Sequence, residues 1–327
     1  MKFKLLFCAC LAMISSTALF ADVAIPFGEG AGKADFINNK KYPKLDDPLP
    51  VGPLSFRLVD NKVWVADSIG GKLMQFDNKG KQISEFSVLP EGTKPYRLDE
   101  YKLPILNIQI EDLAPVLGEY GDAKAFWIVD GVANKLVKFG VDGKKLAEIK
   151  HPEFIQLFRV EVGRGGHIFV ADKASRSIFV FDSDGKFLNK QNWEWSGMAV
   201  SGKDDVLYRL MWDNEAHRNI LVSSNVQGKV LFGKILDVEM FDPRLWWVDE
   251  SKGECLITYT PLEGFKGKLN VVRVGFDGKV KGSCEMPAPA IMNRIIDHMD
   301  YTDVYIGKCN FFEAPEGKFE VVPFKMP

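Results

Sequence analysis

Four arginines occupy matching positions in this chain, each near the start of a stretch of β-forming residues. The stretches begin Phe56-Arg57-Leu58, Phe158-Arg159-Val160, Pro243-Arg244-Leu245 and Asn293-Arg294-Ile295. Guanidinium groups repel one another at close range, and their N–H donors fit the oxygens of a carboxylate or a phosphate. Asp112 stands at the corresponding position of a further stretch and can supply an internal counter-charge. If the fold brings these five residues together, they predict an anion site.

Two interpretations of the arginines stay open. In the first, they bind an anionic small molecule or the acidic end of a peptide. Arg159→Ala or Arg244→Ala would then abolish binding and leave the fold intact. In the second, the arginines are structural and pair with carboxylates of neighbouring repeats. The carboxylates available for such pairing are Asp60, Glu161, Asp249 and Asp297.

A second candidate group lies in an insertion between two repeats, at residues 88–110. It contains Tyr96, Arg97 and Tyr101, and tyrosine and arginine on surface loops are common contacts for a ligand or a partner. Its place in the repeat predicts that it lies on the same face as the arginines. The alternative is that residues 103–110 only fill the seam between two repeats.

The elements that must position these residues recur along the chain. Five Gly-Lys pairs, roughly 40 to 60 residues apart, each mark a sharp reversal between two stretches of β-forming residues. In several reversals an Asp or Asn comes early, where it can bond the backbone, and glycine follows where the turn needs a positive φ. The glycines are Gly80, Gly143, Gly185, Gly228 and Gly278. A repeat of this length with several short strands is typical of a β-propeller.

Aligning the second strand of each repeat predicts six blades, each a four-stranded antiparallel sheet. The aligned segments are 63–67, 126–130, 168–172, 206–210, 255–259 and 303–307. The blades are expected at residues 54–87, 111–150, 155–192, 195–236, 243–287 and 291–327. The sixth repeat lacks an outer strand, and residues 23–28 can supply it, which closes the ring and removes an open sheet edge.

The repeated pattern Val-Ala-Asp, short loop, strand, Phe-Asp-x-x-Gly-Lys resembles NHL repeats, as does the opening Phe27-Gly28-x-Gly30. The pattern runs from Asp67 to Gly80 and from Asp172 to Gly185, and the likeness is strongest in the first three repeats. The resemblance implies a six-bladed propeller. It implies little about activity, because such propellers include kinase sensor domains, a peptide-amidating lyase and scaffolds for protein or RNA partners.

Other kinds of chemistry have little support in the sequence. The histidines are scattered without an HxH or HExxH spacing, and no GxSxG, P-loop or dinucleotide fingerprint occurs. We therefore predict no catalytic residue, no metal ligand and no cofactor. The net charge of −2, with both signs interspersed, argues against nucleic acid as a partner.

Residues 1–21 have the pattern of a signal peptide. Lys2 and Lys4 precede a short apolar run, and small residues follow it, so that cleavage after Ala21 or Ala18 fits. The mature chain is expected to be periplasmic or extracellular, without a transmembrane segment. In that oxidising compartment a disulfide between Cys284 and Cys309 would join two blades, and buried thiols are the alternative.

Together these patterns favour an exported propeller, a single domain over residues 22–327, that acts as a binding module. Its ligand or partner, an unknown protein, peptide or small anion, is expected on the arginine-bearing face near residues 88–110. One alternative is a lactonase- or lyase-type enzyme with a metal in the central channel. Another is a passive structural component of a surface assembly.

Overall fold

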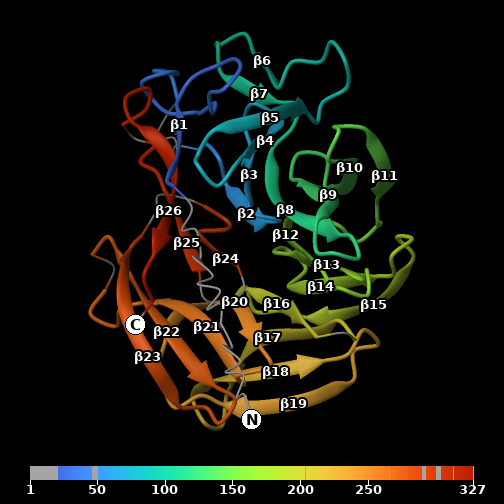
Figure 1. Cartoon of the computed structure of the whole chain (residues 1–327), viewed down its shortest axis with the longest axis vertical. Helices are drawn as coiled ribbons and strands as arrows, with labels where there is room; N and C mark the ends of the chain where they lie inside the picture. The colour runs from blue at the N-terminus through green and yellow to red at the C-terminus, as the bar shows by residue number, and fades with distance from the viewer. Residues whose placement is uncertain are drawn as a thin grey trace, which may run out of the picture.

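Six antiparallel sheets are arranged as a ring around one axis (Figure 1). This computed structural model describes residues 21–45, 51–202, 204–264, 266–288, 292–299, 303–311 and 313–326. The predicted signal peptide therefore lies almost wholly outside the described residues. Within the described ranges the regular elements are β-strands, and no helix there is long and apolar enough to cross a membrane. The predicted six-bladed, four-stranded architecture is confirmed.

Five blades are each formed by four consecutive strands. Blade 1 consists of β2 (Ser55–Val59), β3 (Lys62–Asp67), β4 (Lys72–Phe76) and β5 (Gln82–Ser87). Blade 2 consists of β8 (Ile110–Leu117), β9 (Ala123–Asp130), β10 (Lys135–Gly140) and β11 (Lys145–Ile149). Blade 3 consists of β12 (Leu157–Val162), β13 (Ile168–Asp172), β14 (Ser177–Phe181) and β15 (Phe187–Asn192).

Blades 4 and 5 continue the same order. Blade 4 consists of β16 (Met198–Ser201), β17 (Val206–Asp213), β18 (Arg218–Ser224) and β19 (Val230–Ile235). Blade 5 consists of β20 (Phe241–Asp249), β21 (Glu254–Thr260), β22 (Lys268–Gly275) and β23 (Val280–Pro287).

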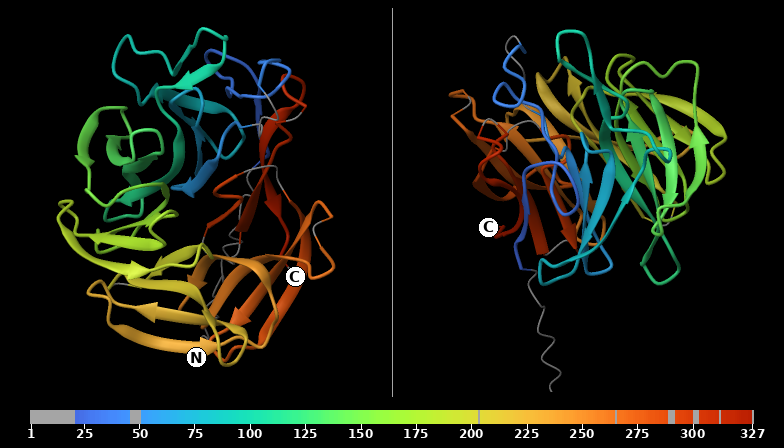
Figure 2. Two further views of the ribbon diagram at one scale, coloured as in Figure 1. Left: turned by 180° about the vertical axis from the view of Figure 1, so that it is seen from behind. Right: turned by 90° about the horizontal axis from the view of Figure 1, so that it is seen from above.

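The sixth blade joins the two ends of the chain. It consists of β24 (Ile296–Met299), β25 (Asp303–Lys308), β26 (Lys318–Phe324) and the N-terminal strand β1 (Val23–Pro26). Strand β1 pairs antiparallel with β26, with Val23 opposite Val321 and Pro26 opposite Lys318. Both views in Figure 2 show the first and last strands side by side. The expected closure by a strand from the N-terminus is confirmed.

The Gly-Lys reversals have the turn geometry that the sequence predicts. Their glycines have φ values between +75° and +86°, a region that L-residues with a side chain rarely adopt. The strand register shifts by one residue at each of these turns, as in a hairpin that ends in a bulge. In each turn the side-chain oxygen of one Asx residue accepts a backbone N–H from the residue two positions later. These acceptors are Asp77, Asp142, Asp182, Asn225 and Asp277.

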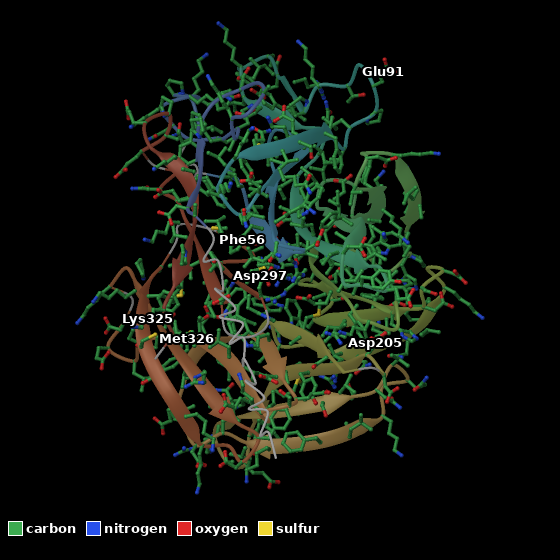
Figure 3. The ribbon with its side chains drawn as sticks, viewed as in Figure 1. Phe56, Glu91, Asp205, Asp297, Lys325 and Met326 are labelled. Carbon is green, nitrogen blue, oxygen red and sulfur yellow. The ribbon has the colours of Figure 1, made fainter. Side chains whose placement is uncertain are left out.

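Burial follows the radial order of the strands. The second strand β3 is almost wholly buried, whereas the outer strand β19 is mostly exposed. The hydrophobic clusters lie between blades: Trp64 of blade 1 packs on Phe126 of blade 2, with ring centroids 4.6 Å apart. Figure 3 places Phe56 and Asp297 near the middle of the ring and Glu91 at its rim. Each blade is therefore stabilised mainly by its neighbours.

The insertion after blade 1 forms a hairpin, β6 (Tyr96–Leu98) paired with β7 (Pro104–Leu106). It packs against residues 27–45, which follow β1 and which we call the N-terminal segment. Tyr42 of this segment meets Tyr96 edge to face, with ring centroids 6.4 Å apart. A small hydrophobic cluster that includes Ile37, Tyr42 and Ile69 joins the two. The hairpin thus has a fixed neighbour that the sequence did not indicate.

The predicted disulfide is not formed in the structure. Cys284 and Cys309 are both thiols, and both pack against the hydrophobic cluster of the last blades. Burial raises the pKa of Cys309 to about 12, as expected for a sulfur among apolar side chains. A Cys284–Cys309 bond therefore stays a prediction for the oxidised protein.

Candidate functional site

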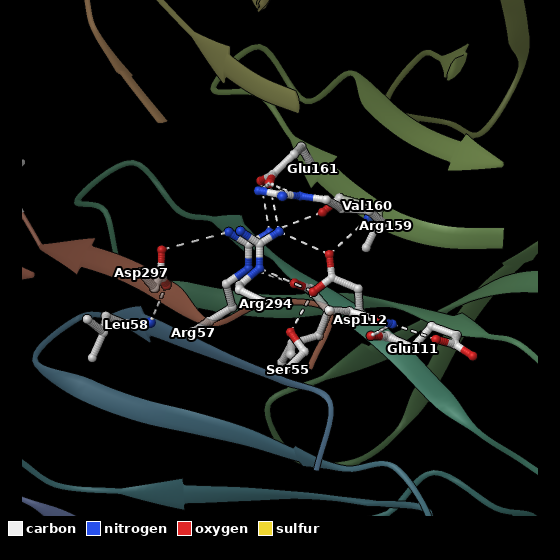
Figure 4. A network of polar contacts seen from close by, with 12 residues as sticks. Ser55, Arg57, Leu58, Glu111, Asp112, Arg159, Val160, Glu161, Arg294 and Asp297 are labelled. Atoms are coloured by element: carbon white, nitrogen blue, oxygen red, sulfur yellow. Dashed lines mark hydrogen bonds and ion pairs between the residues drawn. The ribbon is translucent and has the colours of Figure 1, made fainter. Parts of the chain in front are cut away.

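Three of the four predicted arginines meet at the ring axis. Arg57 comes from β2 of blade 1 and Arg159 from β12 of blade 3, while Arg294 lies two residues before β24 of blade 6. All three are buried. Figure 4 shows their guanidinium groups among the carboxylates of Asp112, Glu161 and Asp297. We call these six residues the axial network.

Glu161 lies at the centre of the network because all three arginines pair with it. Its Oε2 atom lies 2.8 Å from Nη2 of Arg57, and its Oε1 atom lies 2.7 Å from Arg294 and 3.2 Å from Arg159. Asp112 accepts a fork of two bonds from Arg294, at 3.2 and 3.0 Å. Such paired bonds between charged groups are the strong kind. The residues involved come from blades 1, 2, 3 and 6.

Backbone groups and an aromatic ring complete the network. Arg57 also donates to the carbonyl oxygens of Leu113 and Val160. The guanidinium of Arg159 lies 4.9 Å from the ring centroid of Trp246 in blade 5, a cation–π contact. The axis is therefore a cross-blade junction made of charged groups.

The charges of the axial network balance, with three arginines against three carboxylates. Burial tends to raise the pKa of Glu161, but Arg294, Arg57 and Arg159 outweigh it and hold that pKa well below its usual range. Burial and the neighbouring Arg294 lower the pKa of Arg159 to about 9. The counter-charges that the sequence suggested, Asp112, Glu161 and Asp297, are thus present inside the protein.

Arg244 lies apart from the axial network. Its side chain is 36% exposed, and its guanidinium is 3.6 Å from the carboxylate of Asp242. It is close enough to Lys173 for the two charges to repel, and burial together with this repulsion lowers the pKa of Lys173. The four arginines therefore do not form one ring.

A cleft of about 950 Å³ separates the hairpin of the insertion from the N-terminal segment and the edge of blade 1. Tyr96 and Arg97, both predicted site residues, line it. The third predicted residue of the insertion, Tyr101, is 60% exposed and does not line the cleft. A volume of this size suits a small-molecule site. The insertion thus forms one wall of a cleft that lies away from the ring axis.

Lys41 ties the N-terminal segment to the hairpin beside the cleft. Its Nζ atom lies 2.6 Å from Oδ1 of Asp35, 3.0 Å from Glu29 and 3.1 Å from the hydroxyl of Tyr96. It also lies 5.1 to 5.6 Å from the ring centroids of Phe36, Tyr42 and Tyr96. The hydroxyl of Tyr96 donates to Glu29 at 2.8 Å. We call Glu29, Asp35, Lys41 and Tyr96 the latch.

Asp67 lies at the floor of the cleft and has no exposed surface. Its carboxylate accepts the backbone N–H groups of Asp35 and Gly70, at 3.0 to 3.2 Å. Burial raises its pKa to about 7, although these two N–H groups and Lys72 oppose the rise. Asp67 therefore anchors the N-terminal segment, and its charge changes near neutral pH.

Lys72 and Glu85 fix the glycine-rich start of the N-terminal segment. Lys72 donates to the carbonyl oxygen of Gly30 at 2.6 Å and lies 3.4 Å from Glu85. Glu85 accepts the N–H of Gly32 at 3.0 Å. Gly30 and Gly32 have φ values of +99° and +69°, so the backbone path over the cleft favours glycine.

Two cations of the insertion, one in the hairpin and one just before it, differ from the rest of the lining. Lys94 and Arg97 line the cleft and are exposed, and within the described part of the chain neither has a carboxylate at ion-pair distance. The other cations of the lining, Lys41 and Lys72, both have one. The hairpin wall thus carries positive charge without an internal counter-ion.

The sequence did not indicate the latch or the floor of the cleft as site residues. Asp67 was part of the repeated Val-Ala-Asp pattern, and the same position in blade 3, Asp172, accepts N–H groups of residues 155, 156 and 175. In both blades this aspartate accepts N–H groups from its own turn and from a second segment that packs against the blade. In blade 1 that second segment is the N-terminal segment. The Val-Ala-Asp pattern was therefore the signal that could have indicated Asp67 as an anchor.

No family model and no curated protein matches this chain. Solved propellers do resemble it. A calcium-binding protein, regucalcin, from Agrobacterium tumefaciens is 10% identical over 84% of this chain and 90% of its own, with a TM-score of 0.53. A streptogramin B lyase is 15% identical over 94% of this chain and 99% of its own, with a TM-score of 0.50.

A catalytically inactive virginiamycin B lyase from Staphylococcus aureus, solved with quinupristin, is a third structural relative. It is 14% identical over 89% of this chain and 99% of its own, with a TM-score of 0.51. At these identities the likeness concerns the fold alone. Among the described residues, no three His, Cys, Asp or Glu side chains are grouped as metal ligands would be. This chain is therefore a six-bladed β-propeller, and membership of the NHL-repeat family stays a prediction.

Proposed function

We propose that this protein is an exported binding module whose ligand occupies the cleft between the hairpin and the N-terminal segment. The observation that carries the proposal is the pair of cations on the hairpin wall, Lys94 and Arg97, that lack an internal counter-ion among the described residues. An anionic group on a small molecule or a peptide would supply it. The ligand would thus be held at the predicted insertion, away from the axial network.

The axial network supports this choice of place. Its arginines are already neutralised by Asp112, Glu161 and Asp297, so an anion that entered there would have to displace a buried carboxylate. Removing one partner from a buried pair costs several kcal/mol. In the cleft, an anion meets Lys94 and Arg97, which are exposed and have no such partner among the described residues.

A screen of small carboxylates and phosphates by thermal shift, followed by calorimetry on the best binder, tests the proposal. We expect Lys94→Gln and Arg97→Gln each to weaken binding of that anion by about tenfold or more, since a hydrogen bond to a charged group contributes about 1.5–3 kcal/mol. Lys102→Gln is the matched control, because Lys102 is exposed on the same hairpin but does not line the cleft. Equal affinity of all three variants would contradict the proposal.

The rival function is a lactonase- or lyase-type enzyme that holds a divalent metal in the central channel. Metal analysis of the purified protein separates the two, because the rival needs a stoichiometric ion at the axis and the binding module needs none. Mass spectrometry of the protein from its native compartment tests export, with a mature chain that starts at Leu19 or Asp22 as the expected result.

A further inference from the structure

The two walls of the cleft carry opposite charge. On the hairpin wall, Lys94 and Arg97 have no carboxylate within ion-pair distance among the described residues. On the opposite wall, the single ammonium of Lys41 is shared by the carboxylates of Glu29 and Asp35. Lys72 and Glu85 also line the cleft, and their charges cancel at 3.4 Å, so the two carboxylates against Lys41 leave that wall with a net negative charge. A ligand in the cleft therefore meets positive charge on one side and negative charge on the other.

Glu29 is the carboxylate that remains accessible. Its side chain is 66% exposed, whereas that of Asp35 is 5% exposed and turned toward Lys41. A hydrogen bond from Tyr96 and the pairing with Lys41 lower the pKa of Glu29, and the charge of Lys94 contributes. Lys94 and Glu29 both line the cleft, and their charges interact although they are not at ion-pair distance. Glu29 is thus ionised and open to the cleft.

Each wall of the cleft also carries an aromatic ring. Tyr42 and Tyr96 both line the cleft, and their faces already attract the ammonium of Lys41 from 5.6 and 5.3 Å. A second ammonium beside Glu29 would meet the same rings, which favour cations at their faces. The volume of about 950 Å³ leaves room for several residues of an extended peptide as well as for a single amino acid.

We propose that the ligand of the cleft is a zwitterion, namely an α-amino acid or a short peptide with both ends free. Its carboxylate pairs with Lys94 and Arg97, and its ammonium binds Glu29 beside the rings of Tyr42 and Tyr96. This inference rests on the proposed function and adds the chemical class of the ligand. It places recognition in an off-axis cleft and gives the propeller axis a structural task.

The experiment compares ligands that differ only at their ends. L-Phenylalanine, Phe-Ala and Phe-Ala-Ala are titrated into the full mature protein by calorimetry, each also as the N-acetyl and as the C-amide form. We expect the free zwitterion of the best length to bind at least about tenfold more tightly than either capped form, because each cap removes one charged contact. The length series separates an amino acid from a peptide as the ligand.

Paired variants then assign each end to its wall. Arg97→Gln should lower the affinity for the zwitterion by about tenfold and leave the affinity for the C-amide unchanged, since the amide has no carboxylate for Arg97 to bind. Glu29→Gln should lower the affinity for the zwitterion and leave the affinity for the N-acetyl form unchanged. The comparison across capped ligands cancels any general loosening of the latch, which would weaken all forms alike.

Three outcomes decide between the inference and the proposed function. Preference for the free zwitterion, with the two wall-specific losses, supports both. If the N-acetyl carboxylates bind as tightly as the free zwitterions and depend on Arg97, the inference fails and the anion-binding function stands. If no zwitterion and no anion binds in a way that depends on Lys94 or Arg97, both are overturned.

Discussion

The axis and the cleft both collect charged residues from distant parts of the chain, but they treat those charges differently. At the axis, three arginines and three carboxylates are buried and satisfy one another. In the cleft, Lys94 and Arg97 stand on one wall without counter-ions among the described residues, and Glu29 on the other wall is exposed. A matched, buried set of charges joins blades, whereas an unmatched, accessible set can receive a ligand. Charge balance, more than the presence of arginine, distinguishes structure from binding here.

Residue types alone would favour the axis, not the cleft, as the binding site. Four arginines at matching points of a repeat are a stronger pattern than one lysine and one arginine in an irregular insertion. The difference lies in the partners, because Glu161 pairs with all three axial arginines and no described carboxylate pairs with Arg97. The predictions below test whether the two regions differ as this comparison requires.

Substitution at the axis should produce the largest loss of stability. Arg294→Met leaves the buried carboxylates of Asp112 and Glu161 short of a cation, which should lower the free energy of unfolding by about 3–5 kcal/mol. Urea denaturation measures the loss. Arg244→Met is the control, because this arginine is 36% exposed and pairs at 3.6 Å with the exposed Asp242, so that its loss should change stability by no more than about 0.5 kcal/mol. Similar losses for both variants would undermine the comparison.

The floor of the cleft should make stability depend on pH in one direction. Burial raises the pKa of Asp67 to about 7, so the folded protein binds this proton more tightly than the unfolded chain does. The resulting stability is fully present below about pH 4 and is lost as the pH rises through about 7. Asp67→Asn should remove this slope, which amounts to at most about 1.4 kcal/mol per pH unit. Urea denaturation across that range measures it, and parallel profiles for the two proteins would contradict the prediction.

The axis should respond to pH in the opposite direction. Although burial opposes it, Arg294 and Arg57 hold the pKa of Asp112 below its usual range, and the same groups lower that of Glu161. The stability that these carboxylates contribute is present above their ordinary pKa values and is lost as the pH falls below them. Loss of stability in acid should therefore persist in Asp67→Asn. This contrast serves as the internal control of the pH experiment.

The latch should have the smallest effect. Tyr96→Phe removes the hydroxyl that donates to Glu29 and accepts from Lys41 but keeps the ring against Tyr42. We expect a local loss of about 1 kcal/mol, typical of one hydrogen bond, with little change in global unfolding. Hydrogen exchange of the β6–β7 amides measures the local effect. Unchanged protection of the hairpin would show that the latch does not hold it.

The fold was predictable in detail because its signals are local and repeated. The glycines of the Gly-Lys reversals need a positive φ, and the Asx residues before them bond the turn within a few positions. The missing outer strand of the last repeat and the apolar strand near the N-terminus indicated the closure that β1 and β26 form. None of these inferences required knowledge of distant contacts.

The candidate site was predictable only in part. The sequence singled out Tyr96 and Arg97, which line the cleft, and also Tyr101, which does not. It assigned Arg57, Arg159 and Arg294 to one opening and correctly named Glu161 and Asp297 among possible counter-charges, but it also assigned Arg244, which lies elsewhere. It did not identify Glu29, Asp35 and Lys41, because residues 27–45 have no repeat pattern that would place them.

Local sequence patterns were enough to specify the strands, their turns and the number of blades, since backbone conformation and burial pattern follow from neighbouring residues. Only the closed ring established which charges are matched. Whether an arginine is a structural cross-link or part of a binding surface depends on which carboxylates the ring carries to within a few ångströms. In this chain, that difference separates Arg294, which Asp112 and Glu161 neutralise, from Arg97, which no described carboxylate does.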